Sequence, residues 1–391
     1  MKTTFIIALF FCMLESTQIS AQTDSSVSNN ETERFTFKIN GYIKDLNSFS
    51  LPIAPAGFQY TQLVHNRINI KLKSNKITSA LEIRNRLFWG DGPRMVPSLE
   101  KQLRNPNESV DLSRAWFSNN NAVLHSNVER LWVEYRASSW SVKAGRQRIN
   151  WGMNNSWNPN DIFNAYNMFD FDYEERAGVD GVRWQYQPNE LSGLDFAFSR
   201  GSKPKETTAA IKYNLNHNNY DWQLLTGLYN NRATLGLGWQ GNIGGMGFKG
   251  EMQAFRKKIG KGFTINSSVE LDYMTKNGWY IFTSILYNEQ GITKPLNDWS
   301  ALSFKNSPEN LMPTRLNAMG GWSKEFTPII NGRFSVVYAP LTNLLIMIPS
   351  LSYGIATNID IDFFAQSIMA PAKGSYKSIA HTLFVRGKWS F

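Results

Sequence analysis

The sequence predicts an all-β protein, a transmembrane antiparallel up-and-down β-barrel of about 18 strands, with about 14 or 16 as the alternatives. Three observations predict it. Segments of roughly ten residues alternate apolar and polar side chains, long and short connections alternate between these segments, and nothing after the first residues is apolar enough for a spanning helix. Of the 391 residues, 42% are hydrophobic and 14% aromatic, which excludes a disordered chain.

The chain begins with a segment typical of secretory signal peptides, residues 1–21. Lys2 supplies a positive start, Phe5 to Leu14 form an apolar run, and Ala21 offers a small residue for cleavage. Such a run is shorter than the roughly 20 residues that span a bilayer. Cys12 is the only cysteine and lies in this run, so we expect no disulfide or Cys-metal site in the mature chain. A short N-terminal segment, 22–33, then precedes a barrel at 34–391.

The first predicted strand, 34–46, places Phe35, Phe37 and Ile39 on one face and Lys38 and Lys44 on the other. The second, 62–73, repeats this alternation. The same period of two predicts further strands at 77–90, 126–137, 140–153, 178–187, 192–200, 207–215, 219–229, 232–242, 248–256, 262–275, 279–290, 316–326, 330–339, 344–357, 359–370 and 378–391.

The connections between the predicted strands sort by length. Those after odd-numbered strands are long, at 47–59, 91–125, 154–177 and 291–315, whereas those after even-numbered strands, such as 74–76 and 276–278, are short. Transmembrane barrels have short periplasmic turns and long external loops, so we expect these four to be external. The alternative is a secreted soluble β-protein whose apolar faces pack between two sheets.

The end of the chain also fits a membrane barrel. Leu383, Val385, Trp389 and Phe391 share one face, and the last residue is aromatic. This resembles the terminal strand signal read by the barrel assembly machinery, so we expect that machinery and outer-membrane lipid as partners. Pairing of the first and last strands would remove exposed sheet edges. Tryptophans near strand ends suit interfacial girdles: Trp89, Trp140, Trp151, Trp279 and Trp389.

Cations concentrate on the polar faces of the first five predicted strands, where only Glu82 and Glu134 oppose them. Cationic ladders are how pores favour anions, so we expect a pore-lining basic wall. The alternative is a solvated face with some internal salt bridges. The wall would contain Lys38, Lys44, Arg67, Lys71, Lys73, Arg84, Arg86, Arg130, Arg136, Arg146 and Arg148.

The connection at 154–177 is rich in acids and aromatic residues. We expect it to fold into the pore as a constriction loop facing Arg84, Arg86, Arg146 and Arg148, although an ordinary external loop is the alternative. On strict alternation, Lys143 and Gln147 would then face lipid or the rim. The residues of the expected constriction are Trp157, Asp161, Phe163, Asp170, Asp172, Glu174 and Glu175.

A local motif joins this strand and loop. Gly145-Arg146-Gln147 runs through Trp151-Gly152 into Pro159-x-Asp161-x-Phe163. The pattern resembles porin-like outer-membrane barrels of Gram-negative, Bacteroidota-like bacteria, including alginate-export-like and related families. The resemblance implies an outer-membrane barrel that carries a solute, in which the matching Gly145, Arg146 and Gln147 are important.

Catalytic and metal-binding patterns are sparse. The four histidines include no metal-type pair, so we expect no metal or cofactor. Only His381, near Ser378 on the apolar side, is placed for a barrel lipase. The paired acids Asp360 with Asp362 and Glu270 with Asp272 fit lumen lining better than an acid–base dyad.

These features predict a non-enzymatic, passive outer-membrane channel for small hydrophilic, anionic solutes, with no nucleic-acid partner. Export of an acidic polysaccharide is the alternative within transport, because a continuous basic track suits a polyanion. Two other classes stay open: a surface adhesin or scaffold that uses the 91–125 and 291–315 loops, and a barrel lipase.

Overall fold

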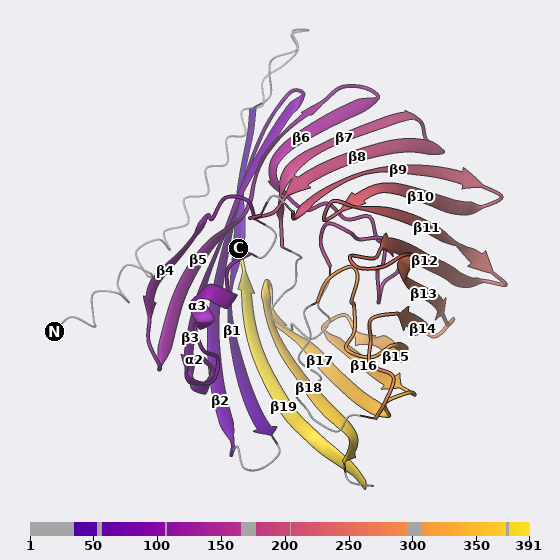
Figure 1. The fold of residues 1–391 in the computed structure, drawn as a ribbon. Helices are drawn as coiled ribbons and strands as arrows, with labels where there is room; N and C mark the ends of the chain where they lie inside the picture. The colour runs from indigo at the N-terminus through magenta and orange to yellow at the C-terminus, as the bar shows by residue number, and fades with distance from the viewer. Residues whose placement is uncertain are drawn as a thin grey trace. The chain divides into compact units, whose positions relative to one another are not determined.

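Neighbouring strands pair antiparallel in chain order, and the first strand pairs with the last, so the sheet closes into a ring (Figure 1). The computed structural model describes residues 35–52, 57–105, 108–165, 177–203, 205–295, 306–372 and 375–391. The expected signal peptide at 1–21 and the segment at 22–33 lie outside these residues. The expected fold class is confirmed: eighteen strands form a closed antiparallel β-barrel.

Each of the predicted strand segments corresponds to a strand, and β3, β8 and β16 have the predicted bounds. The strands are β1 (Phe35–Pro52), β2 (Gln59–Ser74), β3 (Ile77–Gly90), β4 (Ser113–Ser118), β5 (Ala122–Arg136), β6 (Trp140–Gln147), β7 (Val179–Asn189), β8 (Ser192–Arg200), β9 (Thr207–His217), β10 (Tyr220–Tyr229), β11 (Arg232–Ile243), β12 (Met246–Arg256), β13 (Phe263–Met274), β14 (Trp279–Asn288), β15 (Leu316–Thr327), β16 (Ile330–Ala339), β17 (Leu344–Ala356), β18 (Ile359–Ala372) and β19 (Ser375–Ser390).

The extra strand, β4, lies within the expected loop at 91–125, together with two short helices, α2 (Asp91–Met95) and α3 (Leu99–Gln102). β4 pairs with the first part of β5, whereas β6 pairs with the last part of the same strand. β4 therefore lies beside the part of β5 that β6 does not reach. It does not add a strand to the ring.

The ring closes over eleven residue pairs of β1 and β19, from Tyr42 with Ser390 to Pro52 with Ala380. Gly41 and Phe391 extend this ladder by two backbone hydrogen bonds of 2.9 Å. A β-carbon at Gly41 would lie 2.8 Å from the Phe391 ring, so a glycine is needed for the terminal aromatic to pack there.

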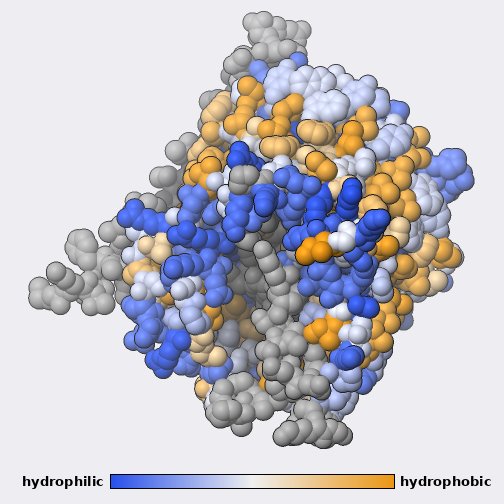
Figure 2. All heavy atoms as spheres, in the orientation of Figure 1, coloured by the Kyte–Doolittle hydropathy of each residue, from blue (hydrophilic) through white to orange (hydrophobic). Residues whose placement is uncertain are grey.

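The two faces of the sheet differ as strand alternation requires. In β14, Ile281 and Ile285 are exposed, whereas Ser284, Leu286 and Asn288 are buried. Figure 2 shows apolar residues along the outer flank and hydrophilic residues around the opening. An outward apolar surface of this kind faces lipid in membrane barrels. Among the described residues, no helix is long and apolar enough to cross a membrane.

Three expectations about the strands need correction. β1 continues to Pro52 and β2 begins at Gln59, so residues 47–52 and 59 of the expected loop at 47–59 are strand. β6 ends at Gln147 rather than near residue 153, because the chain leaves the wall there. Trp151 is therefore not an interfacial residue: it is 1% exposed and packs inside the barrel.

Candidate functional site

A segment of the chain, residues 148–165, leaves the wall after β6 and crosses the lumen; we call it the inner loop. Its departure begins at Gly145, whose φ of 113° is unfavourable for residues with a β-carbon. Beyond it, Ile149, Trp151 and Ile162 are buried. The inner loop thus forms part of the barrel interior over its described residues.

Two wall carboxylates hold the inner loop by its backbone. The N–H groups of Asn154 and Asn160 donate to Glu251 of β12 at 2.8 and 2.9 Å. Those of residues 155 and 156 donate to Glu270 of β13 at 3.1 and 3.0 Å. Both carboxylates are fully buried. Charge-assisted bonds to backbone N–H groups are stronger than neutral ones, so these four contacts anchor the loop.

Side chains add further contacts between the inner loop and the wall. The Trp151 indole N–H donates to Asp195 of β8 at 3.0 Å. The Asn160 amide donates to Gln223 of β10 at 3.0 Å. The loop comes so close to β11 that a β-carbon at Gly238 would lie 2.7 Å from the Met153 sulfur. A glycine in this strand therefore makes room for the loop.

Apolar packing completes the docking. Trp151 and Phe163 contact each other edge to face, with ring centroids 5.0 Å apart, in one buried cluster with Leu225 and Phe255. Trp157 belongs to a second cluster with Leu286, Met312 and other residues of β14 to β18. The buried apolar area stabilises the loop against the wall independently of charge.

A second segment, residues 306–315, also lies against the inner wall, although the sequence predicts an external loop at 291–315. The Asn266 amide donates to the Pro308 carbonyl at 2.8 Å, and the Asn288 amide to the Met312 carbonyl at 2.6 Å. Asn306 also donates to Ala165 of the inner loop at 3.4 Å. Residues 296–305 lie outside the described residues.

The predicted basic wall faces the lumen from the other side, but acids pair with much of it. Arg84 pairs with Glu129 at 2.7 Å, and Arg67 pairs with Glu82. Glu129 is the extra residue of a bulge in β5, where the register shifts. Strict alternation puts it on the other face, which is why the sequence pattern misses it.

Other cations of the predicted wall vary in exposure. Arg86 is buried and donates to the Leu103 carbonyl at 2.6 Å, and Arg130 donates to the Glu129 carbonyl at 2.8 Å. Arg136 is exposed and pairs with Glu134. Buried Lys44 lies near the Tyr42 ring. The remaining cations are exposed: Lys38, Lys71, Lys73 and Arg148.

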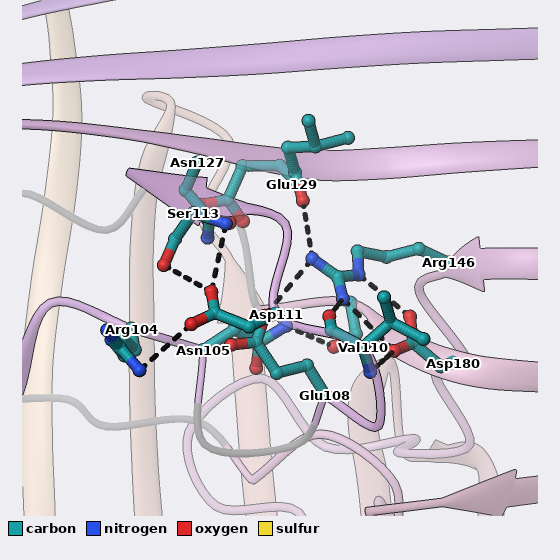
Figure 3. Close-up of polar contacts among 12 residues, drawn as sticks. Arg104, Asn105, Glu108, Val110, Asp111, Ser113, Asn127, Glu129, Arg146 and Asp180 are labelled. Carbon is teal, nitrogen blue, oxygen red and sulfur yellow. Dashed lines mark hydrogen bonds and ion pairs between the residues drawn. The ribbon is translucent and has the colours of Figure 1, made fainter. Parts of the chain in front are cut away.

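Arg146 forms a buried cluster rather than an open part of the wall (Figure 3). Its guanidinium contacts Asp180 of β7 at 2.7 Å, Glu108 at 3.1 Å and the Val128 carbonyl of β5 at 3.0 Å. Asp180 also accepts the backbone N–H of Ser109 at 2.8 Å. This Arg146 cluster joins β5, β7 and the segment before β4 at the point where β6 ends.

Among the acids of the Arg146 cluster, Glu108 is the one whose pKa is raised above its usual value. Burial raises the pKa of its carboxyl to about 7, although the Arg146 guanidinium acts in the opposite direction. The carboxyl is therefore partly protonated near neutral pH.

The prediction that Lys143 faces lipid or the rim is wrong. Its ammonium lies 3.4 Å from the Glu134 carboxylate and over the Trp132 ring, on the inner face. Gly145 interrupts the alternation between Lys143 and Arg146, so residues on either side of it do not follow one parity. Gln147 is buried and donates to the Gly181 carbonyl at 3.3 Å.

A cavity of about 990 Å³ separates the inner loop from the cationic wall. Arg84, Arg86 and Asn127 line it on the wall side, and Ile162 and Phe163 line it on the loop side. The expected loop acids do not form that lining among the described residues. Asp161 instead accepts a hydrogen bond from the backbone N–H of Trp151 at 3.4 Å. The other expected acids lie outside the described residues: Asp170, Asp172, Glu174 and Glu175.

Sequence reasoning placed Glu270 in the lumen lining but missed the other loop anchors. Asp195 and Glu251 lie on inner faces by simple alternation, so parity could have identified them. Their loop partners could not be inferred, because backbone N–H groups carry no sequence signal. In the described part of the chain, no group of three or more His, Cys, Asp or Glu residues could hold a metal ion.

A closed barrel with an apolar outer surface, a polar lumen and an inward loop is the architecture of porin-like outer-membrane barrels, and this protein has the same fold. No protein-family model matches the sequence, and no curated protein matches it.

Solved structures with the same fold come from two Gram-negative organisms. Pseudomonas aeruginosa OccK9 (OpdG) is 9% identical over 91% of this chain and 98% of its own, with a TM-score of 0.59. Acinetobacter baumannii OccAB1 is 10% identical over 90% and 96%, with a TM-score of 0.57. The outer membrane protein OprD from Pseudomonas aeruginosa is 8% identical over 91% and 93%, with a TM-score of 0.56. These similarities concern the fold.

Proposed function

We propose that the protein is a passive outer-membrane channel for small hydrophilic, anionic solutes. The observation that carries the proposal is the cavity of about 990 Å³ between the inner loop and the Arg84 and Arg86 side of the wall. Selection would depend on diameter and wall charge, without a covalent step.

The charge of the cavity supports a preference for anions. Its lining contains six cations, which are Arg84, Arg86, Arg104, Lys205, Arg232 and Lys258, against the two acids Glu206 and Glu309. A confined space with excess positive charge concentrates anions and repels cations. Arg84, Arg104 and Arg232 are offset by ion pairs, so the excess depends mainly on the other three cations.

The inner loop supports a small solute. It is anchored at two buried carboxylates and packed in two apolar clusters, so it narrows the lumen as a fixed element. In this proposal, residues 157–163 form the constriction together with the acids at 170–175. An acidic polysaccharide is the competing cargo, because a continuous basic track would suit a polyanion.

The proposal includes the route to the membrane. The signal peptide would be removed after Ala21, and the barrel assembly machinery would read the terminal strand that ends at Phe391. In the structure Phe391 pairs with Gly41 at the ring closure, so the residue that carries the signal also completes the barrel.

Planar-bilayer recording of the purified protein in a salt gradient tests the proposal. The reversal potential is expected to show anion preference, and Arg86→Gln is expected to reduce it. The matched control is Lys71→Gln, which removes the same charge from the exposed far end of β2 and should have a smaller effect. Cation preference in the unmodified protein, or passage of long polyanions without a size limit, would contradict the proposal.

A further inference from the structure

A hydrogen-bonded Ser–His–Ser arrangement lies on the outward face of β18 and β19, away from the lumen. The Ser378 hydroxyl oxygen is 2.7 Å from Nε2 of His381, and Nδ1 of His381 is 3.0 Å from the Ser367 hydroxyl oxygen. The two ring nitrogens thus have different partners, as a nucleophile–base–orienter set requires.

We propose that Ser378, His381 and Ser367 form an acyl-ester hydrolase site for membrane lipids. This activity is separate from solute passage, because it uses the opposite face of the wall.

The arrangement depends on an irregularity in β19. Residues three apart in a regular strand lie on opposite faces, so Ser378 and His381 could not meet. The register shifts at Ile368 and Met369, which pair with Ala380 and Ser378, so that Ile379 is an extra residue. Ile379 packs against the inner apolar cluster instead. The bulge therefore brings the serine to the side of the histidine.

The same bulge supplies a candidate oxyanion donor. Ile379 follows the nucleophile and is skipped in the register with β18. An extra bulge residue is left out of that ladder, so its N–H is the candidate donor beside Ser378. Backbone N–H groups next to the nucleophile are the usual donors to a tetrahedral intermediate.

The outward direction follows from the neighbours of His381. It pairs with Leu51 on β1, and Leu383 lies two residues along β19; these side chains are 58% and 48% exposed. Because residues two apart share a face, the imidazole is on the lipid-facing surface.

Its height follows from strand geometry. His381 is nine residues before Ser390, the last residue of β19, which is about 30 Å along a strand at 3.3 Å per residue. A tilt of 35–45° converts this to about 21–25 Å along the membrane normal, against a height of about 25 Å for the apolar band of such barrels. The site is thus at the external border of the band, beside the ester groups of outer-leaflet lipids, with apolar surface below it for an acyl chain.

The reaction would proceed in two balanced stages. Nε2 of His381 takes the Ser378 proton as the hydroxyl oxygen attacks the ester carbon. The bond to the leaving alcohol breaks, and the same proton passes to that oxygen. Water then attacks the acyl-serine, gives a proton to Nε2, and the acid leaves as the proton returns to Ser378. The Ser367 hydroxyl oxygen accepts a hydrogen bond from Nδ1–H, which keeps the proton on Nδ1 and leaves Nε2 free as the base.

Full-length protein assembled in detergent micelles is tested with a fluorophosphonate probe, and with two lipid esters, phosphatidylethanolamine vesicles and purified lipopolysaccharide. We expect phosphonylation of Ser378 and release of fatty acid. The lipid that is hydrolysed shows which of the two is the substrate. Ser378→Ala and His381→Asn are expected to lower turnover about 10³-fold or more. Both should keep wild-type conductance.

The matched control is Ser267→Ala on β13, an outward serine between exposed Ile265 and Val269, which should keep full activity. Ser367 is a positioning residue. Ser367→Ala should lower turnover, and Ser367→Asp should restore it with the acidic limb of the pH profile moved to higher pH, because a carboxylate stabilises the imidazolium. Absence of labelling and of hydrolysis in assembled protein, or equal hydrolysis by Ser378→Ala, would overturn the proposal.

Discussion

The β12–β13 wall and the β3–β5 wall both turn charged side chains inward, but the chain covers them differently. On the first, Glu251 and Glu270 accept backbone N–H groups of the inner loop and are fully buried. On the second, Arg86 donates to the carbonyl of Leu103, at the edge of the cavity. The sign of the wall charge therefore selects which end of a peptide group it binds.

This difference has a consequence for transport. A carboxylate accepts several N–H groups at once, so two acids suffice to anchor a loop across the lumen. Once bound, their charge is directed at the loop and not at a passing solute. The guanidinium groups of Arg84 and Arg86 still line the cavity, and this asymmetry of the lumen underlies the proposed preference for anions.

Removal of both carboxylates that anchor the inner loop should have the largest effect on conductance. Glu251→Ala with Glu270→Ala leaves five loop N–H groups without these acceptors, so the inner loop should leave the wall. We expect a severalfold rise in single-channel conductance and a relaxed size limit. Asp272→Ala is the control, since this acid pairs with Lys249 on the same strand face. Unchanged conductance in a correctly assembled double variant would show that the loop does not limit the channel.

Loss of the Arg146 side chain should weaken the wall where β6 ends. Arg146→Gln leaves Asp180 and Glu108 buried without their cation. Removal of one partner of a buried pair costs about 3–5 kcal/mol, which we expect as a loss in the free energy of unfolding in urea. Arg136→Gln is the control, because that exposed pair with Glu134 is worth about 0–1 kcal/mol. Equal losses in the two variants would contradict the role of the cluster.

The contribution of the Arg146 cluster to the free energy of unfolding should depend on pH. The pKa of Glu108 is raised from 4.5 to about 7 on folding, so between these values the folded protein holds a proton that the unfolded chain lacks. The free energy of unfolding should therefore fall as the pH rises through this window, by at most about 3 kcal/mol. The other charged groups that act on it are Arg104, Asp111, Arg146 and Asp180.

Urea unfolding at pH 5 and pH 8 measures this slope. Glu108→Gln has no carboxyl to titrate and should remove the part of the slope that Glu108 contributes. If the wild type and the variant lose equal stability between the two pH values, the shift belongs to other groups.

A single added methyl group on β11 should have the smallest effect on the channel current. Gly238→Ala places a methyl group 2.7 Å from the flexible end of Met153, which can move, so the loop should shift only slightly. We expect noisier open-channel current with a small change in conductance. Gly387→Ala is the control, since nothing lies within 4 Å of its added carbon. Identical noise in the two variants would mean that the loop tolerates the added volume.

The site could be predicted only in part, and single residues show why. Alternation placed Arg84 and Arg86 on the inner face, and the structure agrees. It failed at Glu129, which is the extra residue of a bulge, and at Lys143, which lies two residues before a positive-φ glycine. One extra residue reverses parity for the rest of a strand, and sequence alone does not mark where that happens.

The sequence by itself determined the barrel. Period-two alternation assigns each strand a lipid face and a lumen face, and the lengths of the connections order the strands, because both are local properties of the chain. Tertiary structure alone decided where the chain leaves the wall, that 148–165 and 306–315 lie inside, and that Arg146 is buried between Asp180 and Glu108. These depend on contacts between backbone groups and residues about 100 positions apart, such as Asn154 with Glu251, which no local pattern encodes.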